Sequence, residues 1–177
     1  KAVLGGQANL LIIDDEEDNR QIANLALTMI GGFTVIEADG GEAGVRLAEA
    51  EKPDVILLDW MMPDMDGLET LRRLRELVPQ TQVMMMSGHG SIETAVKAIK
   101  LGAYDYIEKP LSLENVTLRV KHALDQHRLE QENRTLRTKV ERKFELIGQS
   151  PAMRQLKQII ETAGPTNSRV LIGGENG

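Results

Sequence analysis

The chain lacks cysteine, has few aromatic residues and contains only short apolar runs. None of its 177 residues is cysteine, which excludes disulfides, thiolate zinc sites and thiol nucleophiles. Runs such as Leu10–Ile13 fall far short of the roughly 20 apolar residues that span a bilayer, and no signal-peptide pattern opens the chain. A formal net charge of -6 and 3% aromatic residues argue against nucleic-acid binding by this piece. We therefore expect a soluble cytoplasmic protein.

The length and the terminal residues bound the domain organisation. At roughly 150 residues per domain, 177 residues make one full domain and a smaller part. The chain does not begin with methionine, and it ends at Gly177 without a helix stop or a polar tail. We therefore expect a fragment of a longer protein, and we assign no structure to Lys1–Gln7.

Short apolar runs alternate with helical patterns over residues 8–125. We expect strands at residues 9–13, 33–38, 54–59, 81–86 and 103–107. We expect helices at residues 42–50, 68–77 and 91–101, one ending before Gly31 and a long one from Ser112. This alternation predicts an α/β fold with a flavodoxin-like, five-stranded parallel sheet of order 2-1-3-4-5. Its ligand site should lie at the carboxyl ends of strands 1 and 3, where the strand order switches.

An apolar pattern predicts the first helix. Its residues are spaced by three and four positions, at Ile22, Leu25, Ala26 and Met29, which is typical of a helix. We expect the helix to stop at Gly31–Gly32, because glycine readily adopts left-handed backbone at a helix end.

The helix from Ser112 changes character at about Gln126. Its first half carries a stripe that can pack on the sheet, at Val116, Val120, Ala123 and Leu124. Its second half has inner positions spaced by four, three and four residues, at Leu129, Asn133, Leu136 and Val140. This spacing predicts a short coiled-coil seam with one polar inner position. The alternative is a lone solvated linker helix over residues 126–143 whose apolar residues are merely exposed.

Acidic side chains follow the two strands that should be neighbours in the middle of the sheet. Asp14 and Asp15 follow strand 1, and Asp59 ends strand 3. Ser87 follows strand 4, and Lys109 follows strand 5. Each acid alone could be an ordinary strand-end residue, but three close carboxylates repel unless a cation neutralises them. The set predicts an oxygen-ligand Mg²⁺ site with a carboxylate nucleophile, a lysine and a hydroxyl, which suits phosphoryl transfer to a carboxylate.

Residues 8–125 resemble the receiver domain of bacterial two-component response regulators, which has a CheY-like fold. The segments that carry the resemblance are Asp14-Asp15-Glu16, Leu57-Leu58-Asp59, Met62-Pro63-Asp64-Met65-Asp66-Gly67, Met86-Ser87-Gly88-His89-Gly90 and Lys109-Pro110.

The resemblance assigns a role to each residue of the site. It implies that Asp59 accepts a phosphoryl group from a sensor histidine kinase. It implies Mg²⁺ ligation by Asp15, by Asp59, by Asp14 through water and by the backbone carbonyl of Met61. It further implies that the phosphoryl group is contacted by Lys109 and Ser87, that Tyr106 turns inward with Ser87, and that the bond before Pro110 is cis.

The sequence allows two alternative roles for each of two residues near the site. His89 lies two residues after Ser87, where it, like Met61, could tune the access of water to an acyl phosphate. It could equally be an ordinary loop histidine. Tyr106 could be a switch aromatic or simply a half-buried aromatic on an edge strand, because the alternation around it does not decide between them.

Residues 144–177 have a second pattern. Residues 146–153 resemble the opening of the AAA+ domain in NtrC-family activators of sigma-54 RNA polymerase. A strand at 169–172 then leads to glycines, and Gly174 and Gly177 match the first half of a P-loop, with Asn176 where the family commonly has serine. The phosphate-gripping lysine lies beyond the chain. We therefore expect no ATP binding by this piece, and contacts with sigma-54 polymerase and DNA only through missing domains.

Together these features predict a phosphorylation-controlled switch rather than an enzyme. The resemblance implies a homodimer through the fourth helix, the fifth strand, the last helix and the linker seam. One alternative is a haloacid-dehalogenase-type phosphatase, which uses similar groups but carries Asp-x-Asp after strand 1, whereas Asp14 and Asp15 are adjacent. A second alternative is a pseudo-receiver that is never phosphorylated.

Overall fold

The computed structural model describes residues 8–88, 92–143, 148 and 150–163. The chain divides into two units, Lys1–Glu132 and Asn133–Gly177. The first contains a five-stranded sheet of order β2-β1-β3-β4-β5, and every neighbouring pair of strands is parallel. The predicted fold and strand order are therefore confirmed.

The elements follow the expected alternation of strand and helix. The strands are β1 (Asn9–Ile13), β2 (Thr34–Ala38), β3 (Val55–Asp59), β4 (Gln82–Ser87) and β5 (Asp105–Glu108). The helices are α1 (Glu17–Leu25), the π-helical turn η1 (Ala26–Ile30), α2 (Gly41–Glu51), α3 (Gly67–Leu77), α4 (Ile92–Lys100), α5 (Leu113–Lys143) and α6 (Pro151–Ala163).

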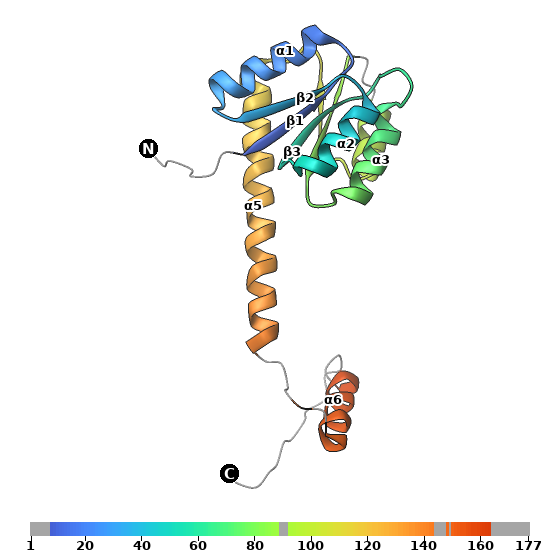
Figure 1. Ribbon diagram of the computed structural model, residues 1–177, viewed down its shortest axis with the longest axis vertical. Coiled ribbons are helices and arrows are strands. Elements are labelled where there is room, and N and C mark those ends of the chain that lie inside the picture. The colour runs from blue at the N-terminus through green and yellow to red at the C-terminus, as the bar shows by residue number, and fades with distance from the viewer. Residues whose placement is uncertain (1–7, 89–91, 144–147, 149, 164–177) are drawn as a thin grey trace. The chain divides into compact units, whose positions relative to one another are not determined.

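The sheet is covered on both faces, which explains why its central strands are continuously apolar. All of β3 is buried, and so is β1 apart from Asn9. One face of the sheet, with Leu11, Ile13 and Leu58, packs against α2 and α3. The other face, with Leu10, Ile12 and Leu57, packs against residues of α1, η1 and α5. Figure 1 shows α1 and α5 on one side of the sheet and α2 and α3 on the other.

The helix predicted to stop at Gly31–Gly32 is present, and the structure decides which of its apolar residues pack on the sheet. Ile22, Leu25 and Met29 are 45%, 52% and 77% exposed. The face that packs on the sheet consists of Ala23, Ala26 and Leu27, all buried. Two apolar stripes adjoin on this helix, and small alanine side chains allow a helix backbone to approach its neighbours closely. The hydroxyl of Thr117 in α5 accordingly donates to the Ala26 carbonyl at 3.5 Å.

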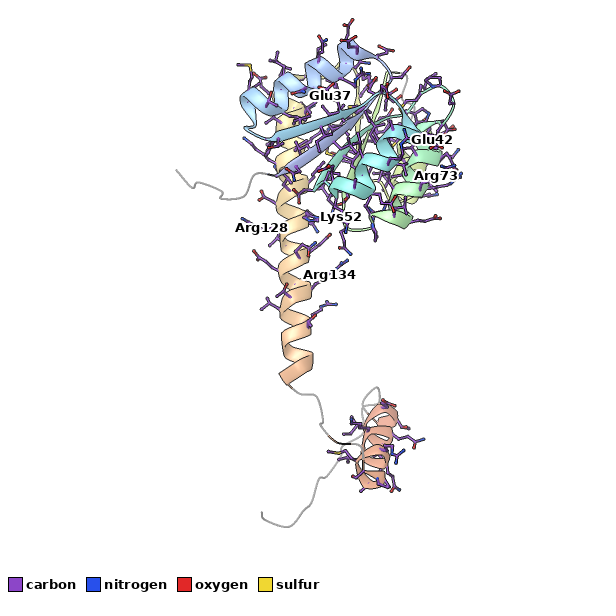
Figure 2. All side chains as sticks on the ribbon, in the orientation of Figure 1. Glu37, Glu42, Lys52, Arg73, Arg128 and Arg134 are labelled. Carbon is purple, nitrogen blue, oxygen red and sulfur yellow. The ribbon has the colours of Figure 1, made fainter. Side chains whose placement is uncertain are left out.

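Helix α5 stays attached to the first unit beyond its apolar stripe. The His127 imidazole Nδ1 lies 2.9 Å from the carbonyl oxygen of Gln80. The Gln82 amide donates to the Glu130 carboxylate at 3.1 Å. Both contacts lie beyond residue 125, and the first unit extends to Glu132. The exposed charges of α5, among them Arg128 and Arg134, are visible in Figure 2.

The second half of α5 and the two ends of the chain concern several further predictions. Leu129 and Leu136 are exposed in this single chain, as a seam without its partner would be. The side chain of Val140 lies outside the described residues. In the second unit, the Met153 N–H donates to the Ser150 hydroxyl at 3.2 Å, so the predicted N-cap of α6 is present. The strand at 169–172, the glycines Gly174 and Gly177 and the leading residues 1–7 all lie outside the described residues.

No helix within the described ranges combines the length and the apolar character that a membrane crossing requires.

The turn from β3 to α3 requires a glycine at position 67. The Gly67 N–H donates to the Trp60 carbonyl at 3.0 Å, and the Asp66 carboxylate caps α3 by accepting from the Glu69 N–H at 2.8 Å. A Cβ atom at Gly67 would lie 2.3 Å from the Asp59 carbonyl oxygen and 2.8 Å from Trp60 Cα. Because these neighbours are backbone atoms, they cannot rotate out of the way.

We expect Gly67→Ala to lower the free energy of unfolding by about 1–3 kcal/mol, the usual size of an overpacking penalty. Chemical denaturation measures it. Gly40→Ala is the matched control, because a Cβ atom there meets nothing within 4 Å; it should cost less than about 1 kcal/mol. Equal losses in the two variants would contradict the close approach at Gly67.

Candidate functional site

Three carboxylates meet at the carboxyl edge of the sheet. Asp14 directly follows β1, and Asp59 is the last residue of β3, the strand beside it. Asp14, Asp15 and Asp59 each offer one carboxylate oxygen, and these oxygens lie within 4.8 Å of one another. Asp14 is completely buried and Asp59 nearly so, whereas Asp15 is exposed. The cluster is therefore open to solvent on the side of Asp15.

Lys109 joins two of the three carboxylates. Its Nζ atom lies 2.8 Å from Asp14 Oδ2 and 2.7 Å from Asp59 Oδ1. The lysine side chain is only 15% exposed, so the ammonium is largely enclosed. Both of its partners follow central strands, while Lys109 itself follows the edge strand β5. The sheet thus brings together residues that are 95 positions apart in sequence.

The charges of the cluster shift two protonation equilibria. Burial raises the pKa of Asp59; the hydrogen bond from Lys109 opposes this shift, and the charges of Asp14 and Asp15 reinforce it. Burial acts to lower the pKa of Lys109, but its hydrogen bonds and charge contacts with Asp14 and Asp59 outweigh burial and raise it. Lys109 is therefore a cation at neutral pH.

Hydrogen bonds from the start of α1 orient Asp14. The Glu16 N–H donates to Asp14 Oδ1 at 2.9 Å, and the Asn19 amide reaches the same oxygen at 3.4 Å. The Arg20 guanidinium donates to the carbonyl oxygens of Asp14 and Asp15. Sequence reasoning missed Asn19 and Arg20. Their only signal is position, because the first turn of a helix that follows the acids can reach back to them.

Ser87 and Tyr106 lie on the two strands beyond β3, Ser87 at the edge that holds the acids and Tyr106 two register positions before that edge. Ser87 is the buried last residue of β4, and its carbonyl accepts a hydrogen bond from the Lys109 N–H at 2.8 Å. Tyr106 on β5 packs against the core, and its buried hydroxyl has no hydrogen-bond partner among the described residues. The Lys109–Pro110 bond is cis. His89 lies outside the described residues.

The loop after Asp59 forms a shallow depression beside the site. The Trp60 N–H donates to the Met86 carbonyl at 2.8 Å, which fixes the loop to β4. A cavity of about 400 Å³ is lined by Trp60, Met61, Met62, Pro63 and Asp66. The Met61 side chain is exposed, so it borders the solvent route to Asp59.

The donor set fits a hard divalent cation. Three carboxylates and one lysine leave two negative charges uncompensated, and all the acidic donors are oxygens. Oxygen donors with a small number of carboxylates are what Mg²⁺ takes in proteins, because it keeps several waters and a phosphate oxygen. A carboxylate beside a cation site and a fixed ammonium can act as a nucleophile toward phosphorus.

The comparisons agree with this geometry. The model of the response regulator receiver domain matches residues 10–121. A putative response regulator, NtrX-like, from Rickettsia bellii is 41% identical over 170 residues, covering 96% of this chain and 36% of the relative. The nitrogen assimilation regulatory protein NtrX from Azorhizobium caulinodans is 38% identical over 173 residues, covering 96% and 37%. The chain thus spans a little over a third of these curated relatives.

Solved structures of response regulators are also similar to this chain. NtrX from Brucella abortus superposes with a TM-score of 0.72 at 36% identity, covering 93% of this chain and 36% of that one. A CheY-like receiver domain protein from Methanospirillum hungatei JF-1 superposes with a TM-score of 0.67 at 29% identity, covering 71% and 99%. The segments at 87–96, 102–110 and 165–169 resemble NtrX, and the matches to NtrX proteins confirm that similarity. The chain belongs to the response regulators of two-component systems, and residues 10–121 are its receiver domain.

Proposed function

We propose that Asp59 is the phosphoacceptor of this receiver domain and takes its phosphoryl group from a sensor histidine kinase. The observation that carries the proposal is the Lys109 ammonium between Asp14 and Asp59, at 2.8 and 2.7 Å, beside a third carboxylate. That arrangement places a positive charge where a phosphoryl group on Asp59 would bring further negative charge.

In the proposed step, a carboxylate oxygen of Asp59 attacks the phosphorus of a phosphohistidine. An O–P bond forms and the N–P bond breaks, and its electron pair returns to the kinase imidazole. Mg²⁺, when bound by Asp14, Asp15, Asp59 and the Met61 carbonyl, would neutralise charge on the transferred oxygens. Lys109 would move its hydrogen bond from the Asp59 carboxylate to a phosphoryl oxygen.

The switch would run from the site through β4 and β5. Ser87 would turn toward the phosphoryl group, and its carbonyl is already bonded to the Lys109 N–H. The unpartnered Tyr106 hydroxyl supports a mobile role for this side chain, because a buried polar group without a partner costs about 1–3 kcal/mol. A local charge change would thereby bias a two-state element. Met61 and His89 would tune the access of water to the acyl phosphate.

The exposed apolar face of α1 supports docking of a kinase helix. Ile22, Leu25 and Met29 form an exposed stripe along α1 and η1, and α1 begins two residues after Asp15. A helix packed there would stand beside the edge of the sheet that holds Asp59. Partner helices bind such stripes through residues at three- and four-residue spacing.

The signal would leave through a second apolar face and through the linker. Helix α4 exposes Ile92, Val96 and Ile99, and we propose that α4, β5 and α5 form a homodimer face continued by Leu129 and Leu136. The domains would be the receiver at 8–125, the linker at 126–143 and the start of an AAA+ sigma-54 interaction domain at 144–177.

The complete protein would act in the cytoplasm as a transcription activator in nitrogen regulation, through sigma-54 RNA polymerase and DNA. NtrX from Brucella abortus has been solved in complex with ATP, which supports a nucleotide site in the parent protein. The adjacency of Asp14 and Asp15 and the place of Asp59 on β3 favour a phosphoacceptor over a haloacid-dehalogenase-type phosphatase.

We expect the chain to gain one phosphoryl group when it is incubated with acetyl phosphate and Mg²⁺. Intact mass spectrometry measures the gain. Asp59→Asn should show none, and neither should the parent chain in EDTA. If the parent gains no mass and forms no stable fluoroberyllate complex, the domain is a pseudo-receiver and the proposal fails.

We expect Asp59→Asn to raise the melting temperature by a few °C in EDTA at pH 7, where about 4 °C corresponds to roughly 1 kcal/mol in a domain of this size. Burial and the charges of Asp14 and Asp15 disfavour the ionised form of Asp59, since its pKa is raised. The gap between variant and parent should narrow as the pH falls through this raised pKa, because the parent then becomes neutral at this position. Scanning calorimetry across pH measures the difference in melting temperature between the variant and the parent. A difference that grows as the pH falls would contradict the prediction.

We expect the chain to dimerise when fluoroberyllate mimics the phosphoryl group. Light scattering after size-exclusion chromatography gives the mass. Ile99→Glu and Leu136→Glu should each weaken the dimer, since each puts a charge into a face that is apolar in the proposed interface. Met29→Glu is the control, because α1 packs on the opposite face of the sheet from α4. A chain that stays monomeric at high concentration with and without the mimic would refute the dimer.

A further inference from the structure

Arg20 is joined to the backbone of both acids that open the site. One of its guanidinium nitrogens donates to the Asp14 carbonyl at 2.8 Å and to the Asp15 carbonyl at 3.2 Å. Its Nε atom lies 3.4 Å from a carboxylate oxygen of Glu37, the penultimate residue of β2. The arginine side chain is only 15% exposed, so these contacts are largely shielded from water.

These contacts restrain the Asp15 side of a turn whose other side-chain hydrogen bonds go to Asp14 and Glu16. Helix α1 begins after Glu16, whose side chain makes no capping hydrogen bond. Among the described residues, no hydrogen bond orients the exposed Asp15 carboxylate, so its direction depends on the backbone that carries it. A guanidinium bonded to two successive carbonyls restrains both peptide planes. Arg20 therefore sets the direction in which the Asp15 side chain leaves the chain toward Asp14 and Asp59.

Glu37 compensates the positive charge of Arg20 beside the cation site. A free guanidinium beside the acids would repel a divalent cation. Its pairing with Glu37 makes the combination neutral, and Glu37 is held in turn by the amide of Asn24 on α1. Figure 2 shows Glu37 where β2 passes under α1. The pair can thus restrain the turn without adding net charge to the site.

We propose that Arg20 is a positioning residue of the cation site, which sets Mg²⁺ affinity by holding the Asp14–Asp15 backbone, with Glu37 as its charge partner. The inference rests on the proposed Mg²⁺-dependent function of Asp59. Groups that orient metal ligands without touching the metal typically contribute about 10–100-fold to affinity. Arg20 acts on the ligands in this way, through their main chain.

Charge alone and positioning predict opposite signs for the loss of Arg20. Arg20→Met removes a positive charge and leaves Glu37 uncompensated, so by electrostatics alone Mg²⁺ would bind more tightly. If the arginine positions Asp15, Mg²⁺ binds more weakly. Arg20→Lys separates the two effects further. Lysine keeps the charge but loses the planar fork that reaches two carbonyls and Glu37 together, so positioning again predicts weaker binding, whereas charge alone predicts no change.

The test is Mg²⁺ titration of the whole 177-residue chain, with the fluorescence of its single tryptophan as the readout. Trp60 directly follows Asp59, so its emission should respond to a cation there. We expect the Mg²⁺ dissociation constant to rise about tenfold in Arg20→Met and by a smaller factor in Arg20→Lys.

The matched control is Arg73→Met. Arg73 also bridges two groups, Glu42 at 3.2 Å and Glu69 at 3.3 Å, but it does so between α2 and α3; Figure 2 labels Arg73 and Glu42 there. The Mg²⁺ dissociation constant of Arg73→Met should stay within about twofold of the parent value, below the change that loss of a ligand-orienting group causes. Melting temperatures of all variants identify any that are merely unfolded, and Arg20→Lys serves if Arg20→Met does not fold.

The outcomes separate this inference from the proposed function. If the parent binds Mg²⁺ and is phosphorylated, while the folded Arg20 variants bind Mg²⁺ equally or more tightly, Arg20 does not position the site and the inference is overturned. An equal loss in Arg73→Met would overturn it too, because the effect would then be general. A parent chain that neither binds Mg²⁺ nor gains a phosphoryl group refutes the proposed function, and this inference with it.

Discussion

The pairing of one lysine with two buried carboxylates is the interaction on which the rest of this structure depends. Lys109 lies within hydrogen-bond distance of Asp14 and Asp59, and removing the lysine would leave two buried carboxylates without this compensating charge. The pairing requires β1, β3 and β5 to end at one edge of a parallel sheet. It also requires the tight turn at Gly67, which packs on the Asp59 backbone. The fold therefore brings three carboxylates and one ammonium together, and the net negative charge of this cluster favours binding of a cation.

The helices around the sheet divide the remaining tasks between its two faces. On one face, α1 supplies hydrogen bonds to the acidic turn through Asn19 and Arg20 and presents an apolar stripe to solvent. On the other face, α4 presents a separate stripe next to β5. The strands that lead to Asp59, Ser87 and Lys109 lie between these helices.

Sequence reasoning succeeded where chemistry is encoded in local runs and failed where neighbouring patterns compete. The apolar runs that end at Asp14 and Asp59 predicted buried parallel strands, since only such strands lack alternation. The spacing on α1 did not decide which residues are buried, because Ala23, Ala26 and Leu27 adjoin Ile22, Leu25 and Met29. The contacts of His127 and Glu130 on α5 are polar and leave no apolar trace in the sequence.

The sequence by itself determined the order of strands and helices, the acids and the lysine at the strand ends, and the family to which the chain belongs. These follow from residue type and short spacing, which the chain carries locally. The tertiary structure alone decided which stripe of α1 is buried, how far α5 stays attached, and that Arg20 reaches the Asp14 and Asp15 carbonyls while pairing with Glu37. The physical reason is that these features depend on packing and hydrogen bonds between elements distant in sequence, and neither leaves a periodic signal.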